Sequence, residues 1–206
     1  MKKFLLFFLG IFLLGNVALM AQDYNRTDDK GRRQGLWTDF YPNGQKRYEG
    51  NFKNNKCVGE FKYYDEQGRL KATNTFDKSG EKALNKTYSE SGTLIATGYY
   101  VNQKKEGEWR YFSKDNGVLI LQEENKNGKV EGISKVFYDT GSLKSECTFV
   151  NGLREGHAKV YYPSGALKEE GDFHEDVKVG IWKSYNEDGD EISSENFSRP
   201  ELNGFE

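Results

Sequence analysis

The feature that most constrains this chain is a turn glycine that returns about every 24 residues. The spacing is 24 residues, with a single interval of 25, and the seven glycines are Gly44, Gly68, Gly92, Gly117, Gly141, Gly165 and Gly189. A fixed period this short is the signature of a repeat array, in which one small unit of structure is copied along the chain. The fold is therefore expected to follow from how such units stack.

Each unit has the pattern of a β-hairpin. In the sixth copy, Tyr-Tyr-Pro-Ser-Gly at 161–165 predicts a strand that enters a tight turn, and residues 167–173 then alternate with a period of two. One copy buries two aromatic residues and a leucine, which stabilise by about 1.5–3 kcal/mol each, whereas ordering the backbone costs about 1–2 kcal/mol per residue. A single copy should not fold alone. We predict an all-β protein, an elongated single-layer antiparallel sheet of about seven stacked hairpins.

Other positions of the unit repeat with the turn glycine. A second glycine stands nine residues before it in most copies, with Ala83 as the exception in the third. An aromatic residue follows it by eight residues in six copies, and Asn125 takes that place in the fourth. The fourth copy also holds one extra residue before Gly117, which predicts a bulge or bend because an insertion moves later side chains to the other face. Lys46 and Glu191 replace the inner leucine in the end copies and are expected to be caps.

The unit resembles the MORN (membrane occupation and recognition nexus) repeat. The resemblance rests on Gly-x-Trp-x-x-(Phe/Tyr)-Tyr-x-x-Gly, then Leu-Lys-x-Glu-Gly-x-Phe and Asn-Gly-x-x-x-Gly, and it covers about residues 31–197. It is closest to the bacterial variant found in proteins labelled as YwqK-type antitoxins. The resemblance implies an elongated sheet used for protein contacts or scaffolding, and it supplies no catalytic residue.

The two ends of the chain differ from the repeats. Lys2 and Lys3 precede an apolar run and a small-residue region up to Ala21, which predicts a signal peptide over 1–21. A membrane anchor is the less favoured alternative, because the run is short and interrupted. We expect a flexible lead-in over 22–30, seven repeats over 31–197 and a tail over 198–206. The mature protein would lie outside the cytoplasm, in the periplasm, at the cell surface or in the medium.

Charge and composition argue against several classes of function. Without Lys2 and Lys3, 28 basic residues face 32 acidic ones, which gives no reason to expect nucleic acid as a partner. The two histidines, His157 and His174, have no second ligand at metal-binding spacing, and no nucleophile, base and orienting group converge. We predict a protein that is not an enzyme and that has no cofactor, no metal and no catalytic residue.

A basic residue recurs two positions before the aromatic residue of the first strand in six of the seven units, and Thr38 takes this position in the first. This basic column consists of Lys62, Lys86, Arg110, Lys135, Lys159 and Lys183. Because the six cations occupy the same position of the unit, they are expected on one face of the sheet, where they would suit an acidic protein surface or anionic head groups. The alternative is cross-strand ion pairs with acidic residues of the neighbouring strands, and the pattern favours it. The acidic residues are Glu49, Glu146, Glu170 and Asp172.

The tryptophans and cysteines also occupy defined phases. Trp37, Trp109 and Trp182 occupy one position of the unit, at which the residue type varies among the other copies. This variation makes the tryptophans candidate contact anchors. The favoured alternative is that they pack over the sheet. Cys57 and Cys147 lie about seven strands apart, roughly 33 Å at the usual strand spacing. That is too far for a disulfide, so we predict two free thiols, with Cys147 directed inward.

The sequence thus favours an exported, non-enzymatic repeat protein that binds or scaffolds another protein. The alternative is an antitoxin or immunity protein that neutralises a toxin by direct binding. A membrane surface is a second candidate partner, and pairing through the exposed end strands would give a homodimer.

Overall fold

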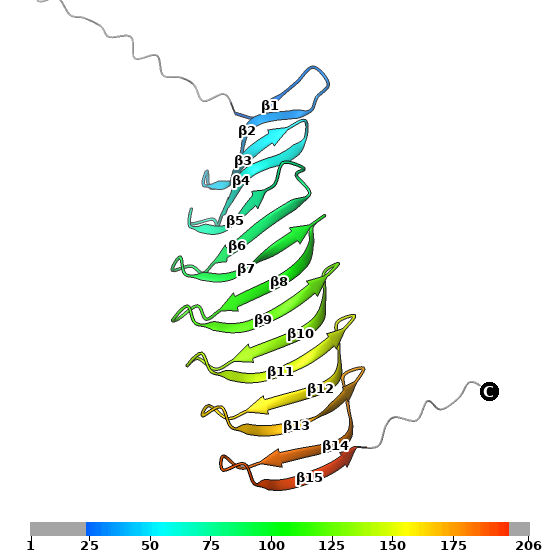
Figure 1. Ribbon diagram of the computed structural model, residues 1–206. Helices are drawn as coiled ribbons and strands as arrows, with labels where there is room; N and C mark the ends of the chain where they lie inside the picture. Colours follow the sequence, from blue (N-terminus) through cyan, green and yellow to red (C-terminus); the bar gives the residue numbers. More distant parts are fainter. Residues whose placement is uncertain (1–23, 198–206) are drawn as a thin grey trace, which may run out of the picture.

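The computed structural model describes residues 24–197, and all of its regular structure belongs to one antiparallel sheet in which each strand pairs with the next along the chain (Figure 1). The expected signal peptide and tail lie outside the described residues. The expected all-β, single-layer array of hairpins is confirmed. The strands are β1 Arg26–Thr27, β2 Arg33–Phe40, β3 Lys46–Lys53, β4 Lys56–Tyr64, β5 Leu70–Phe76, β6 Lys82–Tyr88, β7 Leu94–Val101, β8 Lys104–Phe112, β9 Leu119–Lys126, β10 Lys129–Phe137, β11 Leu143–Val150, β12 Leu153–Tyr161, β13 Leu167–His174, β14 Val177–Tyr185 and β15 Glu191–Phe197.

Two kinds of turn alternate along the array. At one edge the turn glycine closes each hairpin, as where Gly44, with φ of 83°, donates its N–H to the carbonyl of Tyr41 at 2.9 Å. At the other edge most connections are two-residue turns with both φ angles positive, which match the twist of antiparallel strands. These turns are Asn54–Asn55, Asn102–Gln103, Asn127–Gly128, Asn151–Gly152 and Glu175–Asp176.

The second glycine of the unit makes a β-bulge. Gly59, for example, has φ of 67°, and the pairing of β4 with β3 changes register beside it. Equivalent shifts occur beside the glycines of β8, β10, β12 and β14. Ala83 occupies this position in β6, and β6 pairs with β5 in continuous register. Since alanine does not readily adopt positive φ, the missing glycine accounts for the missing bulge.

One side of the sheet, here called the aromatic face, carries the buried apolar side chains. Phe61, Trp109 and Trp182 are 2%, 2% and 5% exposed, and each ring packs edge-on against an aromatic residue of the preceding strand. Asn85, Ser134 and Ala158 are buried at the same phase of the other copies. The face therefore holds a single file of packed residues whose size varies from hairpin to hairpin.

Cross-strand neighbours compensate for this variation in size. Wherever an aromatic residue stands in the file, the residue beside it on the preceding strand is glycine. A Cβ added at Gly98 would lie 2.3 Å from the ring of Trp109, and the same distance separates Gly50 from Phe61 and Gly171 from Trp182. Where the file residue is small, as at Ala158, the neighbour is larger, here Cys147. Each pair of strands is thus matched in volume across the junction between hairpins.

The fourth copy shows how the array absorbs an extra residue. Gly117 donates its N–H to the carbonyl of Ser113 at 2.9 Å, one residue further back than in the other turns. The insertion therefore lengthens the turn, and β8 and β9 keep the pairing of the other hairpins. The predicted bulge or bend at this copy is wrong, because a turn can take up a residue without moving any strand residue to the other face.

Polar residues in the core of the fourth copy form a hydrogen-bonded cluster. Glu123, whose side chain is 12% exposed, accepts hydrogen bonds from Tyr111 at 2.8 Å and from Asn125 at 3.2 Å. The ammonium of Lys105 lies 3.7 Å from the same carboxylate and also bonds the Tyr111 hydroxyl. The asparagine that replaces the repeat aromatic thus helps to satisfy a partly buried charge.

Two further expectations can be compared with the structure. Asn25, in the expected lead-in, holds the outer edge of β2 with two hydrogen bonds to the backbone of Thr38, at 2.8 and 2.9 Å. The described part of the expected lead-in over 22–30 thus includes β1 and pairs with β2. Cys57 and Cys147 are both free thiols, and Cys147 packs against the buried cluster around Ala158, as predicted.

Candidate functional site

The tryptophans proposed as contact anchors lie on the aromatic face. Trp109 and Trp182 are buried, and their indole N–H groups donate to backbone carbonyls of the preceding strands, at 3.0 Å to Tyr99 and 3.1 Å to Asp172. The packing interpretation holds for these two residues, so a role for them as exposed anchors is corrected. Trp37 is half-buried near the end of the array and bonds the carbonyl of Arg26 at 3.2 Å.

The basic column lies on the opposite side of the sheet, here called the basic face, because each cation follows a residue of the aromatic file in sequence. All six side chains are exposed or half-buried. Lys62, Arg110 and Lys183 have ion partners at 3.4, 2.6 and 2.9 Å. Their partners are Glu60, Glu108 and Glu191.

The cross-strand ion pairs favoured by the sequence do not form between the column and Glu49, Glu146 or Glu170 within residues 24–197. Those carboxylates instead accept hydrogen bonds of 2.8–2.9 Å from tyrosine hydroxyls of the following hairpin. Across the whole described chain no ion pair is found for Lys86, Lys135 or Lys159. These three cations therefore have no close ion pair, although Glu146 lies in register with Lys135 and Lys159, and Glu170 with Lys159.

The tyrosine–glutamate bonds make stability depend on pH at alkaline values. Burial, and then the bonded carboxylates Glu49 and Glu146, raise the pKa of Tyr64 and that of Tyr161 to about 12. The folded state therefore keeps protons that the unfolded chain loses from about pH 10, so the free energy of unfolding should fall as pH rises from about 10 through about 12. Urea unfolding across this range would measure the fall, and in Tyr64→Phe/Tyr161→Phe it should be smaller. An unchanged slope in that variant would contradict the assignment.

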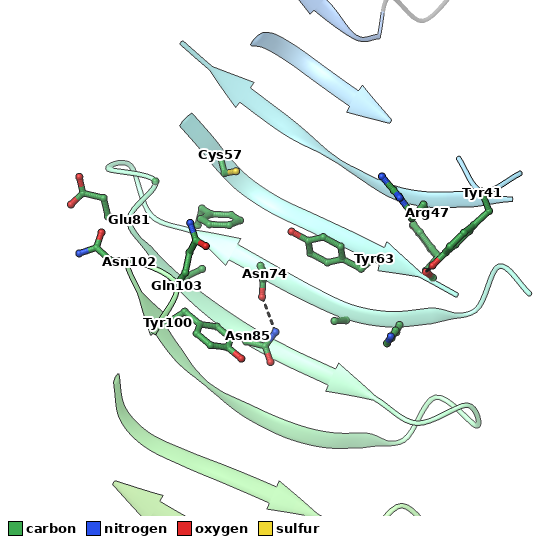
Figure 2. Close-up of a pocket in the computed structure, with 16 residues that line it drawn as sticks. Tyr41, Arg47, Cys57, Tyr63, Asn74, Glu81, Asn85, Tyr100, Asn102 and Gln103 are labelled. Carbon is green, nitrogen blue, oxygen red and sulfur yellow. Dashed lines mark hydrogen bonds between the residues drawn. The ribbon is translucent and has the colours of Figure 1, made fainter. Parts of the chain in front are cut away.

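A groove of about 810 Å³ spans the second and third hairpins on the aromatic face, and sequence reasoning missed it (Figure 2). Tyr63, Asn74, Asn85 and Tyr100 line its middle, contributed by four successive strands from β4 to β7. Tyr41 and Arg47 lie at one end, and Glu81, Asn102 and Gln103 lie at the other (Figure 2).

The groove exists because the third copy departs from the repeat. Asn85 stands where other copies place a bulky ring or a small residue, and Asn74 faces it where glycine would make room for a ring. Beside them, Ala83 pairs with Phe76 on one side and with Tyr100 on the other. No aromatic ring of β6 therefore lies between the rings of Phe76 and Tyr100. The sequence signals that could have located the groove are alanine in place of the bulge glycine and two asparagines in place of a glycine paired with an aromatic residue.

The two asparagines form the polar floor of the groove. Asn85 is 7% exposed and donates from its amide nitrogen to the carbonyl oxygen of Asn74 at 2.7 Å, while its own carbonyl oxygen accepts from Thr87 at 3.0 Å. Asn74 in turn bonds Tyr63, whose pKa is raised chiefly by burial. A chain of neutral hydrogen-bonding groups thus runs along the floor.

Both histidines of the described chain are hydrogen-bonded to carboxylates. Within residues 24–197 no group of three or more His, Cys, Asp or Glu side chains is placed to hold a metal ion. His157 bonds Asp172 and Glu170, each at 3.2 Å, and His174 bonds Glu155 at 3.1 Å. The same residues include no helix long and apolar enough to cross a membrane.

Comparison with known families identifies the repeat. The model described as "MORN repeat variant" matches residues 33–54, 130–151 and 154–175, and the model described as "MORN repeat" matches residues 48–64. Each match falls on a pair of adjacent strands, namely β2–β3, β10–β11, β12–β13 and β3–β4. No curated protein matches the chain significantly. The family matches and the array of hairpins together show that the chain contains MORN repeats.

Proposed function

We propose that the chain is an exported, non-enzymatic scaffold that binds another protein through its basic face. MORN repeats are commonly protein-binding or membrane-binding modules, and the family is generally non-enzymatic. The observation that carries the proposal is the basic column, which continues through six successive hairpins on the face that does not form the core. Lys86, Lys135 and Lys159 in it have no ion partner among residues 24–197.

A protein partner suits this face better than an anionic membrane. Carboxylates alternate with the cations over much of the face, where Glu146 and Glu170 pair in register with Lys159. The chain without residues 1–21 also carries four more acidic than basic residues (28 against 32). A membrane surface attracts summed positive charge, whereas a protein surface can match a pattern of alternating charge. The partner we propose therefore carries acidic side chains spaced to meet the column.

Photo-crosslinking in cells tests the proposal. A photoreactive amino acid at Thr97, between Lys86 and Arg110 on the basic face, should give a discrete protein adduct in an extracytoplasmic fraction. Lys86→Glu/Arg110→Glu should reduce the adduct about tenfold or more, because two favourable contacts become repulsive. The matched control is Lys78→Glu/Lys114→Glu, which changes net charge equally at exposed turn residues and should leave the adduct intact.

Three outcomes would contradict the proposal. They are an adduct found only in the cytoplasm, an adduct equally reduced by both charge reversals, and crosslinking to lipid alone. If the adduct is a toxin and the chain restores growth of cells that make this toxin, the antitoxin alternative holds, with neutralisation as the consequence of the same binding. No specific feature of the site favours that alternative beforehand.

A further inference from the structure

The groove over the third hairpin combines neutral hydrogen-bonding groups with aromatic walls, and we propose that it binds a neutral saccharide. The site is on the aromatic face, away from the basic column, so it is independent of the protein partner proposed above. Its volume of about 810 Å³ lies within the range of small-ligand sites, about 300–1,000 Å³.

The walls provide apolar contact of the kind that a sugar ring needs. Phe76 and Tyr100 are both half-buried and flank Ala83, one strand to either side. They are therefore separated by two strand spacings, roughly 9.5 Å. Each ring already packs on its outer side, Phe76 against Phe61 at 5.3 Å and Tyr100 against Trp109 at 4.9 Å between centroids. Their inner sides face the interruption in the file, where a saturated ring can pack its C–H surface against them.

The floor provides hydrogen bonds for hydroxyl groups. Asn74 and Asn85 use one bond to join each other and further bonds to Tyr63 and Thr87. An asparagine amide has two donor hydrogens and two acceptor lone pairs, so each side chain retains capacity for a ligand. A vicinal pair of hydroxyl groups, each a donor and an acceptor, matches an amide that offers both.

The distribution of charge and polarity excludes two other classes of ligand. The charged lining residues Arg47 and Glu81 lie at opposite ends of the groove (Figure 2), and Arg47 is already paired with Asp39. An anionic ligand would therefore find no cation beside the amides. An apolar side chain from a protein would cover the remaining donors and acceptors of the amides without bonding them, at a cost of about 1–3 kcal/mol for each buried group. A neutral saccharide avoids both costs.

The repeat itself supplies the variant that tests the site. Asn74→Gly/Asn85→Trp recreates at this hairpin the pairing of Gly98 with Trp109, so the indole should fill the groove as it fills the file in the next hairpin. The matched control is Asn51→Leu, which removes an exposed asparagine of β3 on the other face. A gentler variant, Asn85→Leu, removes the amide and keeps a side chain of similar size.

Titration of the purified protein with cellotetraose, maltotetraose and chitotetraose, followed by amide and indole NMR shifts, should show saturable binding of at least one of them. Binding should be lost in Asn74→Gly/Asn85→Trp, weakened about tenfold or more in Asn85→Leu, and unchanged in Asn51→Leu. The proposal is overturned if none of the three oligosaccharides binds at concentrations up to about 10 mM. Binding that survives the filled groove, or binding of tetragalacturonate alone, would also overturn it. The unfolding curve of each variant separates lost binding from lost structure.

Discussion

Replacement of Trp109 by alanine is expected to lower the free energy of unfolding by about 3–5 kcal/mol. Trp109 is 2% exposed, its ring packs edge-on against Tyr100 at 4.9 Å between centroids, and its indole N–H donates to Tyr99 at 3.0 Å. The substitution removes these contacts and leaves a cavity between two hairpins. Urea unfolding followed by circular dichroism would measure the loss.

The partner of Trp109 on the preceding strand makes this prediction more specific. Gly98→Ala should itself cost about 1–3 kcal/mol, because the added Cβ would lie 2.3 Å from the indole ring. Gly98→Ala/Trp109→Ala should cost less than the sum of the single changes, since two small residues then meet as Cys147 and Ala158 do two hairpins later. Additivity of the two single changes within about 0.5 kcal/mol would show that the matched volumes do not act as a pair.

The second large effect is expected at Lys105. Lys105→Met keeps an apolar stem against Trp109, whose ring centroid lies 4.8 Å from the lysine ammonium, but it removes the cation beside Glu123. The carboxylate, 12% exposed, would keep only the neutral donors Tyr111 and Asn125. We expect a loss of about 1–3 kcal/mol in urea unfolding at neutral pH, the cost of leaving a partly buried charge under-satisfied.

Lys178 provides a matched control for this prediction. It occupies the same position of the unit, with its ammonium 3.8 Å from the ring centroid of Trp182, and it pairs with Glu169 at 2.7 Å. The side chain of Glu169 is 31% exposed, so water can solvate it when the cation is lost, and Lys178→Met should cost less than about 1 kcal/mol. Equal losses for Lys105→Met and Lys178→Met, or failure of Glu123→Gln to restore the former, would contradict the assigned role of burial.

The general form of the fold was predictable because it depends on local signals that recur. Turn glycines, alternating polarity and a fixed period together determine hairpins, and hairpins too small to fold alone must stack. The two free thiols were also predictable, because the positions of Cys57 and Cys147 in the repeat place them on distant strands. The sequence did not predict where the extra residue near Gly117 is accommodated, because a longer turn and a β-bulge can each absorb one inserted residue. Only the hydrogen bond from Gly117 to Ser113 distinguishes them.

The candidate sites were less predictable because they depend on departures from the repeat. The phase of the basic column was correct, yet its alternation with glutamates suggested ion pairs, whereas tyrosine hydroxyls bind Glu49, Glu146 and Glu170. The position of a residue in the repeat predicts the face on which its side chain lies, but it does not predict how far the side chain extends or which partner it reaches. The groove required two departures, at Ala83 and at Asn85, to be considered together with their neighbours across the sheet. Only the structure shows which residues of the neighbouring strands lie beside these two positions.

The two ends of the array are unequal, and this inequality limits how the molecule can assemble. At the first end β1 and Asn25 occupy hydrogen-bonding groups of β2, whereas within residues 24–197 no strand pairs with the outer edge of β15. Copies that join through β15 meet tail to tail and leave only their blocked ends outward. Association through β15 alone would therefore stop at a dimer and would not continue into a filament.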